Sequence, residues 1–300
     1  MQRIVKPKTQ RAKRALENRA PKLIENTKTA LFIKGGHTSE LITQVLKDFF
    51  AFKKPDAVLF KRKNVLRPFE DQTSLEFFSE KNDASLFMYG SHSKKRPHNL
   101  IVGRCFDYHV LDMIELRVEK FKSLADFKNA KCSAGIKPCL MFSGEPFEQD
   151  YDYKRLKNLL VDFFRGPVIS NIRLAGLEHV LHFAAVDGKI FIRSYRVNLK
   201  KSGSRTPRVE LEEIGPSLDL ALGRVRLASE DLFKKAMKQP KQAKIRKVKN
   251  ISRDVFGTKH GRIHMQKQDL NTLQTRKMKA LKRKSADAGK DEGMVKKKKD

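Results

Sequence analysis

Three adjacent cations occupy residues 94–96 (Lys-Lys-Arg), in a segment bounded by two apolar runs. The runs at 86–89 and 99–102 are typical of short strands, which places the cations in the loop at 90–97 between them. A loop held by strands at both ends loses little conformational freedom when its cations meet phosphate groups. The segment therefore predicts a phosphate contact, and the alternative interpretation is a solvated hairpin tip.

Most of the positive charge lies in two arms. Residues 234–300 hold 23 Lys and Arg against 6 Asp and Glu, with Phe256 as their one aromatic residue, and residues 1–28 hold 9 basic and 2 acidic residues. The whole chain of 300 residues has a formal net charge of +31. Arms of this composition bury too little apolar surface to fold alone, and each Lys or Arg placed on a phosphate releases a counterion. Nucleic acid is therefore the first partner to expect.

Two shorter cationic clusters share this chemistry. One is 61–63 (Lys-Arg-Lys), beside a strand expected at 56–60, where plain solvated charge explains the residues equally well. The other spans 244–249 and leads into the tail. A nuclear-import signal is a compatible interpretation of that cluster, because importins and RNA both bind such groups.

The residues that catalysis or metal binding would need are not grouped in this sequence. His179 and His182 bracket an expected strand but have no Cys partner and no third His nearby. Glu212 and Glu213 are neighbours on an expected strand, so they face opposite ways and form no carboxylate pair. The segment 34–38 lacks the spacing of a P-loop. We therefore expect no catalytic residue, no metal site and no cofactor.

The cysteines and the hydropathy favour a reducing compartment. The three cysteines are odd in number and form no CxxC pair, which is typical of free thiols in a nuclear or cytosolic protein. The N-terminus lacks the apolar run of a signal peptide, and no stretch of about 18 apolar residues predicts a membrane span.

Strands and helices alternate in the predicted body. Apolar residues recur at helical spacing over 41–50 and 156–164, and short apolar runs bounded by turn residues predict strands. Asp187-Gly188 predicts the turn of a hairpin. The expected strands are 30–36, 56–60, 86–89, 99–102, 139–144, 180–184, 189–192 and 208–212, and the expected helices are 41–50, a short one around 75–78 that Asp71 caps, 156–164 and 225–237.

The body also carries an internal repeat. A strand ending in glycine and a helix ending in Asp-Phe-Phe occur twice, with LKDFF at 46–50 and LVDFF at 160–164. This order predicts two related α/β halves, at about 29–137 and 138–235. Phe191 and Tyr195, next to Arg193, form either a base-stacking platform or a half-buried part of the core, and the core is favoured.

Long motifs resemble a known family. The segment EIGPSLDLALGRVRLAS at 213–229 looks like the closing motif of the Brix domain, and the segments 90–104, 106–116 and 250–279 match one branch of that family. The resemblance implies an α/β fold of two pseudo-repeated halves over 29–235, each like the anticodon-binding domain of class II aminoacyl-tRNA synthetases. It leaves 1–28 as a basic arm and 236–300 as a basic tail that is partly disordered or folds on binding.

The resemblance also implies a role in the nucleolus. Members of this branch are non-catalytic RNA-binding assembly factors of the large ribosomal subunit. As a heterodimer with the regulator of ribosome synthesis protein, they bring the 5S ribonucleoprotein (5S rRNA with ribosomal proteins uL18 and uL5) to pre-60S particles and contact the pre-rRNA. The alternatives are a catalytic RNA-modifying enzyme and a protein-only nucleolar scaffold whose arms serve import.

One residue departs from the family motif. Gly223 stands where an arginine is expected, so a phosphate contact made there in relatives would pass to Arg224 or Arg226 or be lost. The RNA-binding residues that we predict are all cations of the loops, the closing motif and the tail: Lys61, Arg62, Lys63, Lys94, Lys95, Arg96, Arg224, Arg226, Lys244, Arg246, Lys247, Lys249, Arg253, Arg262, Arg276 and Lys277.

Overall fold

The computed structural model describes residues 7–19, 25–169, 171–238, 248–256 and 258–273. The chain divides into two units, Met1–Ala243 and Lys244–Asp300, and each is described by itself. The predicted RNA-binding residues Lys244, Arg246, Lys247, Arg276 and Lys277 lie outside the described residues.

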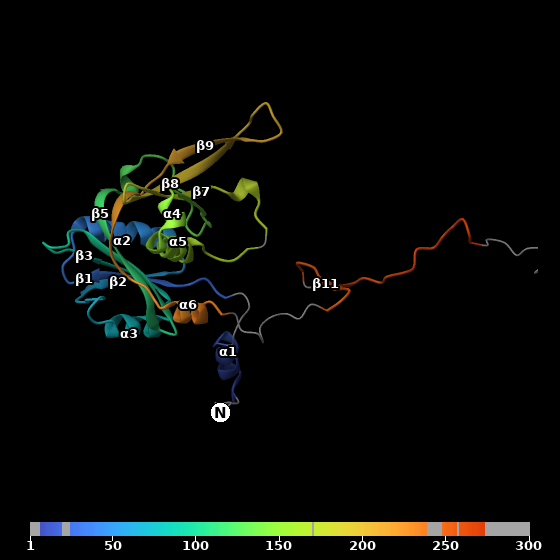
Figure 1. The fold of residues 1–300 in the computed structure, drawn as a ribbon, viewed down its shortest axis with the longest axis horizontal. Helices are drawn as coiled ribbons and strands as arrows, with labels where there is room; N and C mark the ends of the chain where they lie inside the picture. The colour runs from blue at the N-terminus through green and yellow to red at the C-terminus, as the bar shows by residue number, and fades with distance from the viewer. Residues whose placement is uncertain (1–6, 20–24, 170, 239–247, 257, 274–300) are drawn as a thin grey trace, which may run out of the picture. The chain divides into compact units, whose positions relative to one another are not determined.

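The strands of the first unit form one ten-stranded sheet in the order β2-β1-β3-β4-β5-β10-β8-β7-β6, with β9 paired to β8 (Figure 1). The N-terminal arm contains α1 (Gln10–Arg19), a local helix where no regular structure was expected. The elements of the first half are β1 (Ala30–Gly35), α2 (Glu40–Lys53), β2 (Ala57–Asn64), α3 (Thr73–Asn82), β3 (Leu86–Ser91), β4 (Asn99–Phe106) and β5 (His109–Lys122).

The second half begins after a short 3-10 helix, η1 (Leu124–Asp126). Its elements are β6 (Cys139–Ser143), α4 (Pro146–Gln149), α5 (Tyr151–Phe164), η2 (Leu174–Gly176), β7 (His179–Val186), β8 (Lys189–Lys200), β9 (Arg208–Glu213), β10 (Ser217–Arg226) and α6 (Glu230–Ala236). The second unit contains the hairpin of β11 (Ile251–Arg253) and β12 (Lys259–Gly261).

Local sequence explains the main boundaries. Ser39 caps α2, because its hydroxyl accepts a hydrogen bond from the backbone N–H of Ile42. Asp187 and Gly188 both have positive φ, which matches the two-residue turn predicted between β7 and β8. Asp71 does not cap α3 in the expected way. The helix is preceded by Gln72, and the Asp71 carboxylate accepts hydrogen bonds from the backbone and hydroxyl of Thr73.

The two halves repeat one strand pattern. In the first half β1 is parallel to β3, and β3, β4 and β5 are successively antiparallel. In the second half β6 is parallel to β7, and β7, β8 and β10 are successively antiparallel. The last strands of the two halves, β5 and β10, pair with each other and join the halves into one sheet. Between α5 and β7, where the chain order of the first half has β2 and α3, the described residues of the second half form only the 3-10 helix η2.

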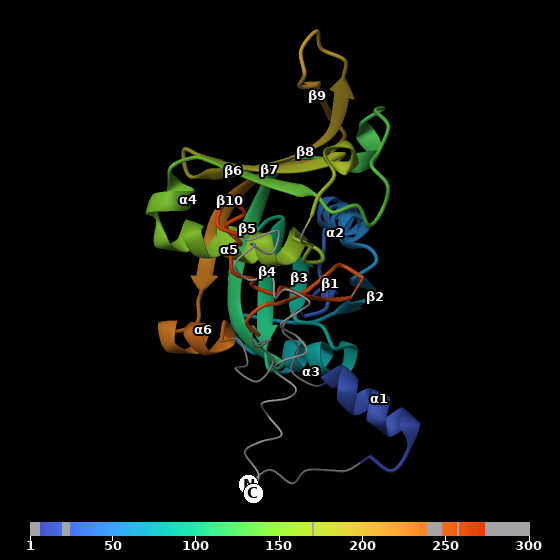
Figure 2. The same cartoon turned by 90° about the vertical axis from the view of Figure 1, so that its right-hand side faces the viewer.

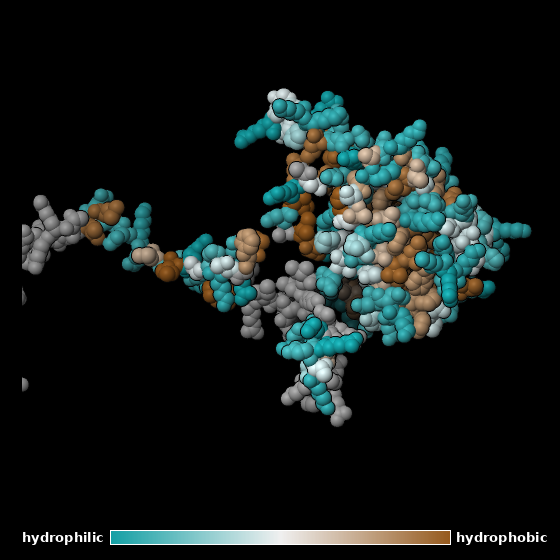
Figure 3. Space-filling view, turned by 180° about the vertical axis from the view of Figure 1, so that it is seen from behind, coloured by the Kyte–Doolittle hydropathy of each residue, from teal (hydrophilic) through white to brown (hydrophobic). Residues whose placement is uncertain are grey.

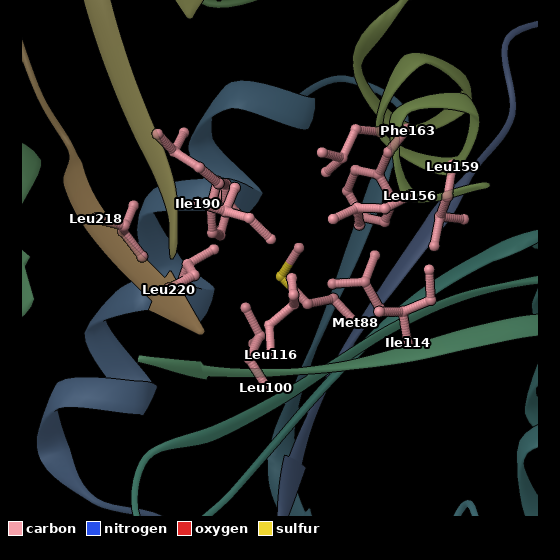
Figure 4. Packing of buried hydrophobic residues seen from close by; sticks show 14 of the residues in the cluster. Met88, Leu100, Ile114, Leu116, Leu156, Leu159, Phe163, Ile190, Leu218 and Leu220 are labelled. Atoms are coloured by element: carbon pink, nitrogen blue, oxygen red, sulfur yellow. The ribbon is translucent and has the colours of Figure 1, made fainter. Parts of the chain in front are cut away.

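One core is shared by both halves. Helices α2 and α5 lie between the strands of the two halves (Figure 2). Their repeated Phe residues meet there, with the ring of Phe49 5.7 Å from that of Phe164, and Phe163 edge-on to Phe32 at 5.9 Å. Side chains from β3, β4, β5, α5, β8 and β10 fill the rest of this space (Figure 4). The shared core predicts that neither half is stable alone, because each would expose these apolar faces.

The closing segment corrects one sequence prediction. A helix was expected over 225–237, but Ser217–Arg226 is strand β10 and the helix starts only at Glu230. The apolar residues Leu218 and Leu220 are fully buried because β10 pairs with β5 on one side and with β8 on the other. These pairings join residues far apart in sequence. Strand β10 therefore joins the two halves, and the α6 helix that follows it also contacts both, because Arg104 of the first half and Arg155 of the second lie over the ring of Phe233.

A buried histidine makes stability depend on pH. His179 is buried beside Ser194, with 2.8 Å between Nε2 and the hydroxyl oxygen, and burial lowers its pKa from 6.5 to about 4. Between these pH values the unfolded chain binds more protons than the folded chain. Lowering the pH through this window should therefore reduce the free energy of unfolding, by about 3 kcal/mol for this group.

Chemical denaturation of the wild type and of His179→Gln at pH 7 and pH 4.5 checks this. Glutamine keeps a polar partner for Ser194 but does not titrate, so the variant should lose less stability than the wild type across the window. Equal losses in the two proteins would show that other groups carry the pH dependence.

Candidate nucleic-acid interface

The loop between β3 and β4 is held at both ends by hydrogen bonds. The backbone N–H of His92 donates to the carbonyl of His37 at 2.8 Å, and the ring of His98 lies 2.9 Å from the hydroxyl of Ser39 at the start of α2. Ser93 and Arg96 exchange backbone hydrogen bonds across the tip. Lys94, Lys95 and Arg96 are exposed between these anchors. The loop therefore presents its cations from a fixed backbone.

The cluster at 61–63 lies inside a strand and not beside one. It forms the end of β2, the edge strand of the sheet, and all three side chains are exposed. The pairing of β1 with β2 shifts register between Phe32 and Lys34, so Lys61 and Arg62 lie in an irregular stretch of the edge strand. The side-chain amide of Asn64 donates to the Arg62 carbonyl at 3.0 Å and steadies this stretch.

The fold brings the two clusters to one edge of the sheet. Lys63 is paired with Lys34, and Lys34 is paired with Gly90, next to the last residue of β3 before the loop at 92–98. Because β1, β2 and β3 are parallel, their carboxyl ends meet at this edge, and two strand spacings place the ends of β2 and β3, which carry the clusters, about 10 Å apart. We call this surface the cationic rim; it consists of Lys61, Arg62, Lys63, Lys94, Lys95 and Arg96.

A buried glutamate orients two of the predicted arginines. Glu115 accepts a hydrogen bond from Arg224 Nε at 2.7 Å, and Arg96 Nη1 lies 3.6 Å from its other oxygen. Burial raises the pKa of Glu115, and Arg96 opposes that shift. The guanidinium of Arg224 also lies over the ring of Phe69 at 4.0 Å. The sequence patterns did not predict a role for Glu115, because it is far from Arg224 along the sequence and meets both arginines only in the folded sheet.

The structure shows what glycine permits at position 223, where the family motif has an arginine. The pairing of β10 with β5 passes from Leu222 opposite Leu116 to Val225 opposite Ile114, so Gly223 and Arg224 together face Glu115 in a bulge. A Cβ at Gly223 would lie 3.1 Å from the Glu115 side chain and backbone oxygen. Glycine therefore leaves room for the Glu115–Arg224 pair.

The remaining predicted residues lie elsewhere. Arg226 is exposed opposite Met113, roughly 13 Å along the sheet from the end that carries the loop at 92–98. Lys249, Arg253 and Arg262 are exposed in the second unit. The structure thus places the six rim residues at one edge of the sheet and Arg224 beside Arg96 at Glu115, and the RNA contacts of all of them stay predictions.

The side chains considered for other chemistry have partners within the fold, some of them buried and others on the outer face of the sheet. His182 lies 2.8 Å from the hydroxyl of Ser143, while His179 faces Ser194 on the other side of the sheet. Arg193 pairs with Asp219 at 2.6 Å and stacks over Phe191. Within the described ranges, no three His, Cys, Asp or Glu side chains are grouped to hold a metal ion. No helix in the described part of the chain is long and apolar enough to cross a membrane.

Comparison with known proteins decides the family. The Brix domain profile matches residues 35–224, from the end of β1 to the Arg224 bulge. The chain is 65% identical to the human ribosome production factor 2 homolog over 261 residues, which cover 87% of this chain and 85% of that protein. The chain belongs to the ribosome production factor 2 branch of the Brix domain family. The Drosophila melanogaster homolog is 50% identical over 282 residues, with 94% and 88% of the two chains covered.

The Brix match contains the cationic rim in full. A crystal structure of a probable ribosomal biogenesis protein from Aeropyrum pernix K1 covers 67% of this chain and 99% of its own, with 12% identity and a TM-score of 0.43. The assignment to the Brix family depends on the sequence matches and not on this structural likeness.

Each cation of the anchored loop between β3 and β4 should contribute more to RNA affinity than a cation of the tail. Replacing Lys94, Lys95 and Arg96 together with alanine should weaken binding to 5S rRNA well beyond the loss from Lys296, Lys297 and Lys298, because the anchored loop loses less freedom on binding. Binding of both triple variants is measured at one fixed salt concentration. Thermal stability should change by no more than about 0.5 kcal/mol per site. Equal losses of affinity would mean that only total charge matters.

Proposed function

We propose that the chain is a non-catalytic RNA-binding assembly factor of the large ribosomal subunit, acting in the nucleolus. It recruits the 5S ribonucleoprotein, formed by 5S rRNA with uL18 and uL5, to pre-60S particles as a heterodimer with the regulator of ribosome synthesis protein. The relatives in human and fly, named ribosome production factor 2 homologs, support the assembly role.

The cationic rim carries the RNA part of this proposal. Two segments 30 residues apart in sequence converge on one sheet edge, and Lys61–Lys63 and Lys94–Arg96 supply six cations there. Among the described residues the rim forms one ion pair, between Arg96 and Glu115. A surface with this excess of charge favours a polyanion, and its fixed spacing favours a structured RNA over a flexible one.

The protein partner has a candidate surface on the second half. In the first half, α3 covers the outer face of the sheet, and Leu75 and Phe78 pack there against Phe87 and Ile101. In the corresponding part of the chain, the described residues of the second half form no α-helix and only the 3-10 helix η2. Its outer face carries Met141, which is exposed, and His182, Arg193, Phe191 and Tyr195, which are half-buried. We therefore place the partner on this uncovered face.

A neighbouring loop adds exposed apolar side chains. In chain order, the segment between α5 and β7 corresponds to β2 and α3 of the first half. Its exposed apolar residues are Val168, Ile169, Ile172 and Leu174. Apolar surface also interrupts the polar surface of the body in the space-filling view (Figure 3). Apolar groups gathered in this way are typical of a protein–protein interface.

The partner surface is tested by a matched pair of substitutions. Ile172→Asp should weaken heterodimer formation at least about tenfold, because it places a charge in an apolar interface. Phe77→Asp is the control, since Phe77 is 53% exposed on α3 of the first half and Ile172 is 66% exposed. The two variants are compared by co-purification and by titration calorimetry with the regulator of ribosome synthesis protein. Unchanged affinity of Ile172→Asp would place the partner elsewhere.

RNA recognition is tested across a salt series. The full chain should bind 5S rRNA with an affinity that falls steeply as salt rises, and at about 150 mM salt it should prefer 5S rRNA to a single-stranded homopolymer of equal length. A protein-only scaffold with import arms would bind both RNAs alike. An RNA-modifying enzyme would release a modified RNA, which mass spectrometry of the bound 5S rRNA would detect.

A further inference from the structure

A β-hairpin in the basic tail has a fixed base. Strands β11 and β12 pair antiparallel, with Ile251 opposite Gly261 and Arg253 opposite Lys259. Asn250 closes the base, because its carbonyl accepts from the backbone N–H of Arg262 at 2.7 Å and its side-chain oxygen lies 2.8 Å from the ring of His264. This segment therefore has local structure in a tail of predominantly basic composition.

The hairpin has no core of its own. Its tip carries Val255 and Phe256, which are 88% and 92% exposed, and Ile263 just beyond β12 is also exposed. Two strands of three residues are marginally stable without a covered face. Burial of these exposed apolar side chains against a binding partner would therefore be favourable.

The charges around the tip point to a polyanion. Arg253 and Lys259 lie directly opposite each other on one face, an arrangement of like charges that destabilises an isolated hairpin. Neither of them, nor Arg262, takes part in an ion pair within the described part of the tail. Phosphate groups would remove the repulsion and occupy both cations.

We infer that this hairpin is a base-stacking clamp for RNA, in which Arg253 and Lys259 hold phosphates while the ring of Phe256 stacks on an unpaired base. An exposed aromatic ring beside cations is the combination with which proteins bind single-stranded segments. The inference rests on the RNA-binding function proposed above and adds a specific contact. The competing possibility is that the ring of Phe256 inserts into an apolar groove of a protein partner, and the test below distinguishes the two.

Removing the ring without changing charge tests the stacking contact. Phe256→Ala should lower affinity for a 5S rRNA transcript about 5- to 100-fold at fixed salt, the range for loss of one aromatic stack, and should leave the salt slope unchanged. Val255→Ala is the matched control, since Val255 is equally exposed but has no aromatic ring, and its affinity should stay within about twofold. Arg253→Ala should instead flatten the salt slope.

Fluorescence gives a second readout. The chain has no Trp, so Phe256→Trp introduces a single tryptophan at the tip, which can be excited selectively at wavelengths where the five Tyr absorb little. Its emission should be quenched when the RNA transcript is added, whereas that of Phe77→Trp on α3 should not change. The stacking inference would be overturned if the full chain binds RNA, the emission of Phe256→Trp is not quenched, and Phe256→Ala keeps its affinity. The proposed function would still stand in that case. A response of the Trp to the protein partner alone would also overturn it. Absence of RNA binding by the full chain would overturn both.

Discussion

Truncation after Met237 should weaken binding to 5S rRNA at least about 100-fold at 100 mM salt and should flatten the dependence of affinity on salt. The removed segment, 238–300, holds 21 Lys and Arg against 6 Asp and Glu. If only six of these cations meet phosphates, their loss removes several units from the slope of log affinity against log salt. Filter binding of the full chain and the truncated chain over 50–300 mM salt measures both quantities.

The truncated body should still unfold cooperatively. The cut lies beyond α6, and among the described residues the shared core of the body includes none after Leu227. The thermal transition of the truncated protein should therefore stay sharp, and its binding to the protein partner should persist. In this account the tail supplies most of the RNA affinity and the body binds the protein partner. Loss of cooperative unfolding in the truncated chain would contradict that division. An unchanged salt slope would contradict it as well.

Replacing Arg104 with methionine should lower the free energy of unfolding by about 3–5 kcal/mol, although methionine fills a similar volume. Arg104 is buried and donates to Asp112 at 2.9 Å and to Asp162 at 2.8 Å. Asp112 is 1% exposed and also accepts from the backbone N–H of Ala228 at 2.8 Å. Without Arg104, Asp112 would be a buried charge with no cation beside it. Urea denaturation measures the change.

A surface arginine on the neighbouring strand provides the control. Arg117 is exposed and lies 3.5 Å from Glu119, so Arg117→Met should change stability by no more than about 1 kcal/mol. The ring of Phe233 on α6 lies over Arg104, so loss of Arg104 should also loosen α6, which hydrogen exchange would detect. Similar stability of the two variants would contradict the central place of Arg104 in the fold.

Local patterns predicted the elements whose partners are close in sequence. The helices at 41–50 and 156–164 have regular apolar spacing, and the Asp187-Gly188 turn fixes its hairpin within a few residues. Strand β10 was interpreted in part as a helix because its identity depends on β5, which lies about 100 residues earlier and was not predicted as an element. Pairings at that distance leave no periodic signal in the strand itself.

The candidate site was predictable in its parts and not in its assembly. The cations at 61–63 and 94–96 are visible as clusters, but their meeting at one edge follows from the parallel order of β2, β1 and β3. The Glu115 carboxylate that orients Arg224 is likewise set by tertiary packing. Within the described residues, no α-helix of the second half corresponds to α3 of the first half, and this difference becomes visible only when the elements of the two halves are compared.

Crosslinking of the full chain to 5S rRNA, with the crosslinked peptides and nucleotides mapped, tests the central claim most directly. The account predicts crosslinks at the cationic rim, in 61–63 and 94–96, and at the tail hairpin, in 249–262. It also predicts that the outer face of the second half stays free of RNA. Crosslinks on that face, with the rim and the hairpin untouched, would contradict the account.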